Sequence, residues 1–241
     1  MSEIWIIISR IKIFSTIIMT EEQTYKQVLN KIDWILEIAK RKNWNIITMP
    51  FVDEPATIEE INAVEKQIGK TIPLDFKKLF LFSRHVDFGY SFDETLSEEF
   101  REEFKDNFAG EIYWNLNTLV EQYVRFQGWV GLYLDPQYND PDEIELAEKT
   151  WFDKLPIIDV TNGDTILVGN NPSEVVYFSH EMDEMHGKIL GENLWAFLDF
   201  YSRIGFAGSE CWQLEPFFDY DNDVMITHGS KVDRYIELLE K

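Results

Sequence analysis

The sequence predicts an α+β fold in a single domain over residues 20–241. Segments near both ends carry apolar residues at helical spacing, whereas the middle of the chain carries short β-branched runs separated by turn residues. The sequence has no internal repeat and no low-complexity linker that would mark a domain boundary. With 45% hydrophobic and 15% aromatic residues, the chain can fill one sizeable core.

Residues 1–19 are set apart from this domain. They are rich in isoleucine, but Arg10 and Lys12 interrupt the apolar run, which makes it too short and too charged for a membrane span. A basic region before the run and a small-residue cleavage site are both missing, which argues against a signal peptide. We interpret the segment as a non-native extension before a start near Met19, or as a loosely attached strand.

A helix is predicted over residues 20–42. Thr20 is suited to cap its first turn, and Gln23 stands where a capping box needs it. Apolar residues recur on one face, and basic residues in the last turn complement the helix dipole. A short extended segment is expected at residues 46–52.

Two further helices follow. Thr57 and Glu60 form a capping box for the first of them, and Gly69 is placed to end it. Pro73 opens the second helix, because proline is well suited to a first turn. Its buried stripe is expected to consist of Phe76, Leu79, Phe80 and Phe82.

Residues 87–108 are dense in carboxylates and phenylalanines. The four-residue spacing of Phe100, Phe104 and Phe108 predicts a helix with an apolar stripe and an acidic outer face. Carboxylates around an aromatic anchor suit a basic protein partner, because charge steers the encounter and the ring adds affinity. The alternative is an ordinary solvated helix face. The predicted partner-binding residues are Asp93, Glu94, Glu98, Glu99, Glu102, Glu103 and Phe104.

The next segments alternate in type. A strand is predicted at residues 112–114 and a helix at residues 116–126, followed by a loop at residues 128–140 and a short acidic helix at residues 141–149. The residues expected to point inward from the longer helix are Leu119, Val120, Tyr123 and Val124.

A meander of three strands is predicted at residues 155–160, 165–168 and 174–178. Its β-branched content fits a pleated surface, and Asn162-Gly163 between the first two strands predicts a type I′ turn. Apolar residues at helical spacing from Leu194 to Tyr201 then predict a helix. The tail is expected to form two strands and a terminal helix, at residues 212–218, 223–227 and 232–240.

The charge of the chain restricts its partners. Acidic residues number 44 against 22 basic residues, so the formal net charge is −22. Such a surface repels nucleic acid and anionic lipid and attracts basic proteins, although acidity can also serve solubility alone. Cys211 is the only cysteine, which excludes an internal disulfide and fits a reducing, cytoplasmic location.

Sequence motifs that would indicate metal binding or catalysis are weak. His180, Asp183 and His186 have the residue types of a zinc site, but a zinc site needs three or four convergent ligands, and a solvated acidic loop explains the segment more simply. Cys211 is better explained as a small buried residue than as a nucleophile.

Two other acidic groups carry partial motifs. The spacing of Asp219, Asp221 and Asp223 starts like a calcium loop but lacks the glycine and glutamate that such a loop requires, which leaves a low-affinity cation site of another kind as the alternative. Asp159 and Asp164 could be read as an acid–base pair, but Asp164 is more simply a turn residue. We therefore predict no catalytic, cofactor or metal site.

Two stretches together resemble a known family. The first is the capped helix from Thr57 with its Gly-x-x-Ile-Pro-x-Asp-Phe-Lys-x-Leu-Phe continuation to Leu81. The second contains the strand from Lys154 to Ile157, the Gly163-Asp164 turn, the strand 175–178 and the helix 194–198. In order and separation they resemble the SUKH superfamily, the Smi/Knr-like domains whose fungal members regulate cell-wall assembly and killer-toxin resistance. The resemblance covers residues 57–208.

The resemblance implies helices packed on a twisted, mainly antiparallel sheet, without catalytic residues or a cofactor. It also implies a protein partner: bacterial members are mostly immunity proteins that neutralise a toxin's nuclease or other effector domain, whereas fungal members act as signalling scaffolds. The chain departs from the family pattern at residues 83–89, in the acidic insertion up to Asp106, and in the tail beyond Gly208.

Three functional hypotheses follow. The first is a non-enzymatic, cytoplasmic immunity protein that blocks the basic active site of a cognate toxin, most simply a nuclease. The second is a regulatory or scaffold protein without a toxin partner. The third is a metal-dependent hydrolase that uses the acidic loops.

Overall fold

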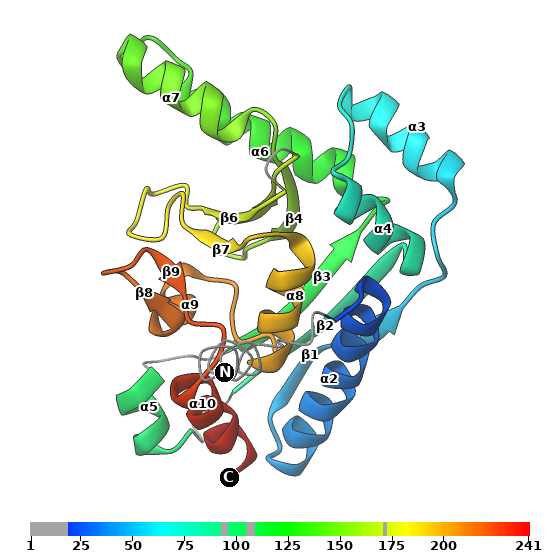
Figure 1. The fold of residues 1–241 in the computed structure, drawn as a ribbon, viewed down its shortest axis with the longest axis vertical. Helices are drawn as coiled ribbons and strands as arrows, with labels where there is room; N and C mark the ends of the chain where they lie inside the picture. Colours follow the sequence, from blue (N-terminus) through cyan, green and yellow to red (C-terminus); the bar gives the residue numbers. More distant parts are fainter. Residues whose placement is uncertain (1–18, 93–95, 105–108, 171–172) are drawn as a thin grey trace, which may run out of the picture.

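The structure, a computed structural model, describes residues 19–92, 96–104, 109–170 and 173–241. These residues form helices and three antiparallel sheets, which confirms the predicted α+β fold (Figure 1). The first sheet has the order β1-β2-β3 and consists of β1 (Asn45–Val52), β2 (His85–Ser91) and β3 (Ala109–Asn115). The second has the order β4-β5-β6-β7 and consists of β4 (Leu155–Asp159), β5 (Thr165–Val168), β6 (Val175–Phe178) and β7 (Ile189–Gly191). The third pairs β8 (Phe218–Asp219) with β9 (Val224–Met225).

The helices pack around the two larger sheets. They are α2 (Glu21–Arg41), α3 (Ile58–Ile68), α4 (Leu74–Phe82), α5 (Glu98–Phe104), α6 (Leu119–Tyr133), α7 (Pro141–Trp151), α8 (Leu194–Arg203), α9 (Cys211–Leu214) and α10 (Ser230–Glu240), with a 3-10 turn η1 (Glu215–Phe217) after α9. Helix α8 packs against α2 and α4, and α5 packs against α10 near the C-terminus (Figure 1). Strand β3 contacts β4, so the two larger sheets meet along these strands.

Local sequence signals explain where the N-terminal helices begin and end. The hydroxyls of Thr20 and Thr57 accept hydrogen bonds from the backbone N–H groups of Gln23 and Glu60, and both capping boxes are complete. Helix α3 ends at Gly69, whose φ of 74° is the left-handed conformation that glycine adopts without strain. These predicted boundaries are confirmed.

The second sheet is covered on both faces, which explains its continuous apolar strands. Ile166 and Tyr177 face the main core, whereas Leu167, Val176 and Phe178 face a smaller cluster under α6 and α7.

The first sheet depends on one close contact. Gly110 of β3 lies under the ring of Tyr90, and a Cβ atom at this glycine would stand 2.4 Å from the ring. The Tyr90 hydroxyl donates a hydrogen bond of 2.7 Å to the Gly205 carbonyl. The sheet is thereby tied to the end of α8.

Two elements of this region differ from the prediction. Strand β2 was not predicted, because the dense acidic residues after it obscured the apolar alternation of Val86, Phe88 and Tyr90. Helix α6 continues to Tyr133, well into the predicted loop, and Val124 is 64% exposed instead of buried.

The tail and the hairpin turn also differ from the prediction. Residues 211–217 form α9 and η1, not a strand, because Glu210 and Gln213 make a capping box and Pro216 favours a turn. In the β4–β5 turn Gly163 has a φ of 102° but Asn162 does not have a positive φ. The turn is therefore not type I′, which requires positive φ at both central residues.

Candidate interaction surface

Helix α5 carries the part of the predicted partner-binding segment that the structure describes. Asp93 and Glu94 lie outside the described residues. Glu98, Glu99, Glu102 and Glu103 are all exposed.

The α5 glutamates fall into two pairs. Glu99 and Glu103 both form ion pairs with Arg234 of α10, the second with an N–O distance of 3.0 Å. Among the described residues, Glu98 and Glu102 form no ion pair, so their charges are free to act on a partner.

Phe104 holds α5 to the core. Its side chain is 1% exposed, and its ring centroid lies 4.9 Å from that of Tyr235 and 5.7 Å from that of Phe217. The prediction made Phe104 an aromatic anchor for a partner, but in this structure its ring is covered by the protein's own core. Among the described residues of α5, both phenylalanines are buried, so its acidic face presents no aromatic side chain.

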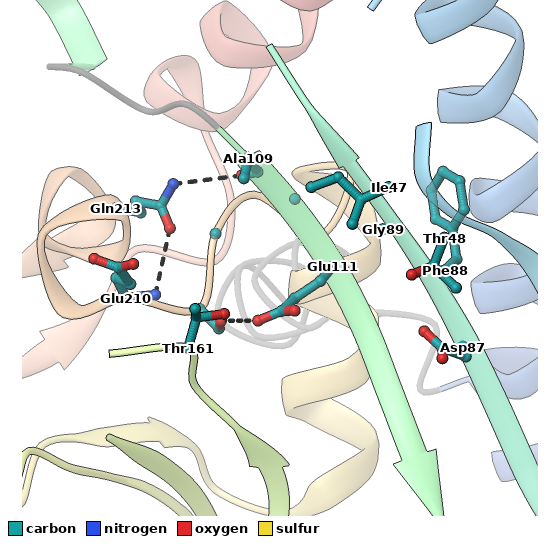
Figure 2. A pocket seen from close by; sticks show the side chains of 13 residues that line it. Ile47, Thr48, Asp87, Phe88, Gly89, Ala109, Glu111, Thr161, Glu210 and Gln213 are labelled. Atoms are coloured by element: carbon teal, nitrogen blue, oxygen red, sulfur yellow. Dashed lines mark hydrogen bonds between the residues drawn. The ribbon is translucent and has the colours of Figure 1, made fainter. Parts of the chain in front are cut away.

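A second acidic feature lies on the outer face of the first sheet, where a cavity of about 300 Å³ opens (Figure 2). Three carboxylates line it: Asp87 from β2, Glu111 from β3, and Glu210 from the loop before α9. Thr161, in the β4–β5 turn, closes the side opposite the sheet (Figure 2). The carboxylates are far apart in sequence, so no local pattern could have predicted the cavity.

The cavity carries negative charge that is only partly compensated: Nε2 of His85 lies 4.0 Å from the Asp87 carboxylate and acts to lower its pKa. Burial raises the pKa of Asp87, and burial together with the neighbouring Asp87 and Glu210 raises the pKa of Glu111 although Ser209 donates a hydrogen bond to it. Trp212 donates a hydrogen bond of 2.8 Å to Glu210. Within the described part of the chain, no lysine or arginine lies within 4.0 Å of these three carboxylates.

An exposed apolar strip borders the cavity. It belongs to β1, an edge strand of the first sheet, where Ile47 is 61%, Met49 63% and Phe51 47% exposed. The Phe51 ring lies 4.9 Å from that of His85, which flanks Asp87 on β2. An exposed apolar patch rimmed by polar groups is typical of a protein–protein interaction site.

Asp164 lies at the hairpin turn as predicted, and its side chain also binds neighbouring segments. Its buried carboxylate accepts hydrogen bonds from the Tyr177 hydroxyl at 2.7 Å, the His180 backbone N–H at 3.0 Å and the Asn162 amide at 2.8 Å, and it pairs with Nδ1 of His180 at 2.7 Å. Burial acts to raise the pKa of Asp164, but the hydrogen bonds from Tyr177 and His180 outweigh it and lower the pKa. Asp159, its supposed partner in acid–base chemistry, instead pairs with Arg125.

The three residues of the possible zinc motif do not converge. His180 binds Asp164, whereas Nδ1 of His186 donates to the Ser179 carbonyl at 2.7 Å. In the described chain, the side chains that bring three ligand-type atoms within 4.8 Å of one another are Asp164, Asp183 and Cys211. Because both oxygens of Asp164 already accept hydrogen bonds and burial raises the pKa of the Cys211 thiol, this group has the properties of a structural cluster.

The residues of the Asp219 segment bind other groups. Asp219 accepts hydrogen bonds from the backbone N–H groups of Asp221 and Asn222, and Asp223 pairs with Lys188 at 2.7 Å. The segment is thus a self-stabilised turn that leads into β9.

The comparison with known families decides the classification. Residues 55–199 match the model of the SMI1 / KNR4 family (SUKH-1), which covers more than half of the chain. The chain belongs to this family. The resemblance identified from the sequence is thereby confirmed. No curated protein matches the chain.

Membership in SUKH-1 supports a domain of the immunity or regulatory type. The family is generally non-catalytic and is known for protein–protein interaction. The matched region includes α5 and two of the cavity carboxylates, Asp87 and Glu111, whereas Glu210 lies beyond it.

No helix within the described residues combines the length and apolar character that crossing a bilayer requires.

Proposed function

We propose that this SUKH-1 protein is a non-enzymatic, cytoplasmic immunity protein that neutralises a cognate toxin domain by covering its basic active site. The observation that carries the proposal is the coincidence of family membership with a net charge of −22. A nuclease must hold phosphates in a basic cleft, so a protein that blocks such a cleft is expected to be acidic. The carboxylates of α5 and of the cavity contribute to that charge.

The decisive experiment is co-expression with a toxin domain encoded beside the gene. We expect the protein to restore growth of cells that produce the toxin. The second candidate function, a regulatory scaffold, also has support from the family and would be favoured if no adjacent toxin exists or if growth is not restored. A stoichiometric metal in elemental analysis of the purified protein would favour the hydrolase hypothesis instead.

Charge reversal on α5 tests whether this helix steers the partner. Replacing Glu98 and Glu102 by lysine should slow association with the toxin by about tenfold at low salt, and less at high salt, because the free carboxylates attract a basic surface over a distance that ions screen. Stopped-flow fluorescence at two salt concentrations measures the rate. Thermal stability should not change, because neither residue makes an ion pair among the described residues.

Two variants serve as controls. The first replaces the exposed Glu121 and Glu148, on α6 and α7, by lysine. It changes the net charge by the same amount as the Glu98/Glu102 variant but on other helices. The second replaces Glu99 and Glu103 by lysine, which breaks the ion pairs with Arg234 and should also lower the melting temperature. An equal loss of rate in the Glu121/Glu148 variant would show that net charge, not α5, governs association.

A further inference from the structure

The cavity on the first sheet is formed by segments that are distant in the chain. Asp87 and Glu111 project from adjacent strands, where Asp87 pairs with Tyr113 and Glu111 pairs with Gly89. They are therefore diagonal neighbours on one face, and such residues lie about 7–8 Å apart, with their Cβ atoms somewhat closer. The loop from Gly208 to Gln213 forms the opposite wall (Figure 2).

The spacing of the carboxylates points to an organic cation and not to a metal ion. A bound metal needs its ligand atoms gathered around one point. Asp87, Glu111 and Glu210 do not gather in this way, since the described side chains that come within 4.8 Å as a set of three are those of Asp164, Asp183 and Cys211. A guanidinium or ammonium group carries several N–H donors and can hydrogen-bond carboxylates that stand apart.

The charge of the cavity is incompletely compensated in the protein itself. Burial raises the pKa of both Asp87 and Glu111, which means that their ionised forms are disfavoured in the free protein. A cation placed between them would remove this penalty. A volume of about 300 Å³ is also sufficient for the end of a long basic side chain.

The apolar strip beside the cavity suggests what carries the cation. Ile47 lines the cavity, and Met49 and Phe51 continue the exposed strip along β1. Pro50 and two irregularities in the β1–β2 register disfavour pairing of another strand along this edge. The face of β1 is thus better suited to side-chain packing than its edge is to strand addition.

On this basis, which rests on the proposed function, we infer that the cavity bordered by Asp87, Glu111 and Glu210 receives an arginine or lysine side chain of the partner, while apolar residues beside it in the partner pack on Ile47, Met49 and Phe51. The occupant is a basic partner segment, because a second copy of a chain with a net charge of −22 would be repelled.

The probe for this inference is a fluorescein-labelled peptide that carries one arginine flanked by leucines, measured by fluorescence anisotropy against the full chain. A peptide with citrulline in place of arginine has nearly the same shape without the charge. We expect the arginine peptide to bind the wild-type protein at least about tenfold more tightly than the citrulline peptide, the effect of losing a charged hydrogen bond.

Matched variants locate the binding. The Asp87→Asn/Glu111→Gln variant should bind the arginine peptide about tenfold more weakly, whereas Glu98→Gln/Glu102→Gln on α5 removes the same charge and should alter binding less than about twofold. The Glu111→Gln change should leave the melting temperature unchanged or raise it, because the amide has no buried charge. Equal losses in both variants, no loss in the cavity variant, or no binding of the arginine peptide to the wild-type protein would overturn the inference.

Two further results separate this inference from the proposed function. If the wild-type protein neutralises the toxin and the cavity variant does so equally well, the inference fails and the proposed function stands. If the peptide binds in the cavity but the toxin is not neutralised, the inference stands and the proposed function fails. Conversion of a dimer to a monomer by Ile47→Lys in sedimentation would identify a second copy as the occupant and overturn the inference.

Discussion

Replacing Asp164 by alanine is expected to lower the free energy of unfolding by about 3–5 kcal/mol. The carboxylate is 2% exposed and binds Tyr177, His180 and Asn162, so its removal leaves several buried donors without an acceptor. These bonds join the β4–β5 turn to β6 and to the loop after it. Urea denaturation at pH 7 measures the loss.

Asp159→Asn is the matched control, because Asp159 lies in the same hairpin but is partly exposed and pairs with an exposed arginine. It should cost less than about 1 kcal/mol. A loss of similar size in both variants would contradict the role given to the Asp164 network.

The Asp164 network also predicts a dependence on pH. Because the pKa of Asp164 is lowered in the folded protein, its contribution to stability is present above the ordinary carboxyl pKa of about 4 and is lost as the pH falls through the lowered value. The Asp164→Ala variant should therefore lose less stability on acidification than the wild-type protein does. Parallel acid titrations of both proteins would contradict this expectation.

Phe104→Ala is expected to destabilise the protein by about 3–5 kcal/mol. Its ring contacts those of Phe217 and Tyr235. Phe104 and the neighbouring Phe100 are the buried apolar residues through which α5 packs on the core. Urea denaturation measures the effect, with Glu102→Ala on the exposed side of the same helix as the control. A Phe104→Ala protein with wild-type stability and weakened partner binding would instead support the aromatic anchor predicted from the sequence.

Much of the fold follows from local sequence chemistry. The caps at Thr20 and Thr57 and the glycine at position 69 determine helix boundaries within one turn of chain, so they could be recognised without a structure. The apolar strands of the second sheet were also recognisable, because burial on both faces demands continuous apolar runs.

The remaining features depend on contacts between distant segments. The spacing of Phe100 and Phe104 predicted an apolar stripe, but only the position of α10 shows that the stripe is covered by Tyr235 and not offered to a partner. Likewise the role of Asp164 depends on the β5–β6 register, which brings Tyr177 and His180 to it.

Part of the candidate surface could be recognised from the sequence and part could not. The acidic residues of α5 could be found from the sequence because they lie close together in it. The cavity could not, since its carboxylates come from β2, β3 and the loop before α9, and the sequence does not show which α5 glutamates Arg234 neutralises.

The most direct test of the central claim, neutralisation by binding, is titration of the purified toxin domain with this protein while the activity of the toxin is measured. If the protein covers the active site of the toxin, toxin activity should be abolished at one equivalent of the protein. The activity should return when high salt dissociates the complex. Complete and irreversible inactivation by a small fraction of one equivalent would indicate catalysis and contradict the account, as would full toxin activity in the presence of excess protein.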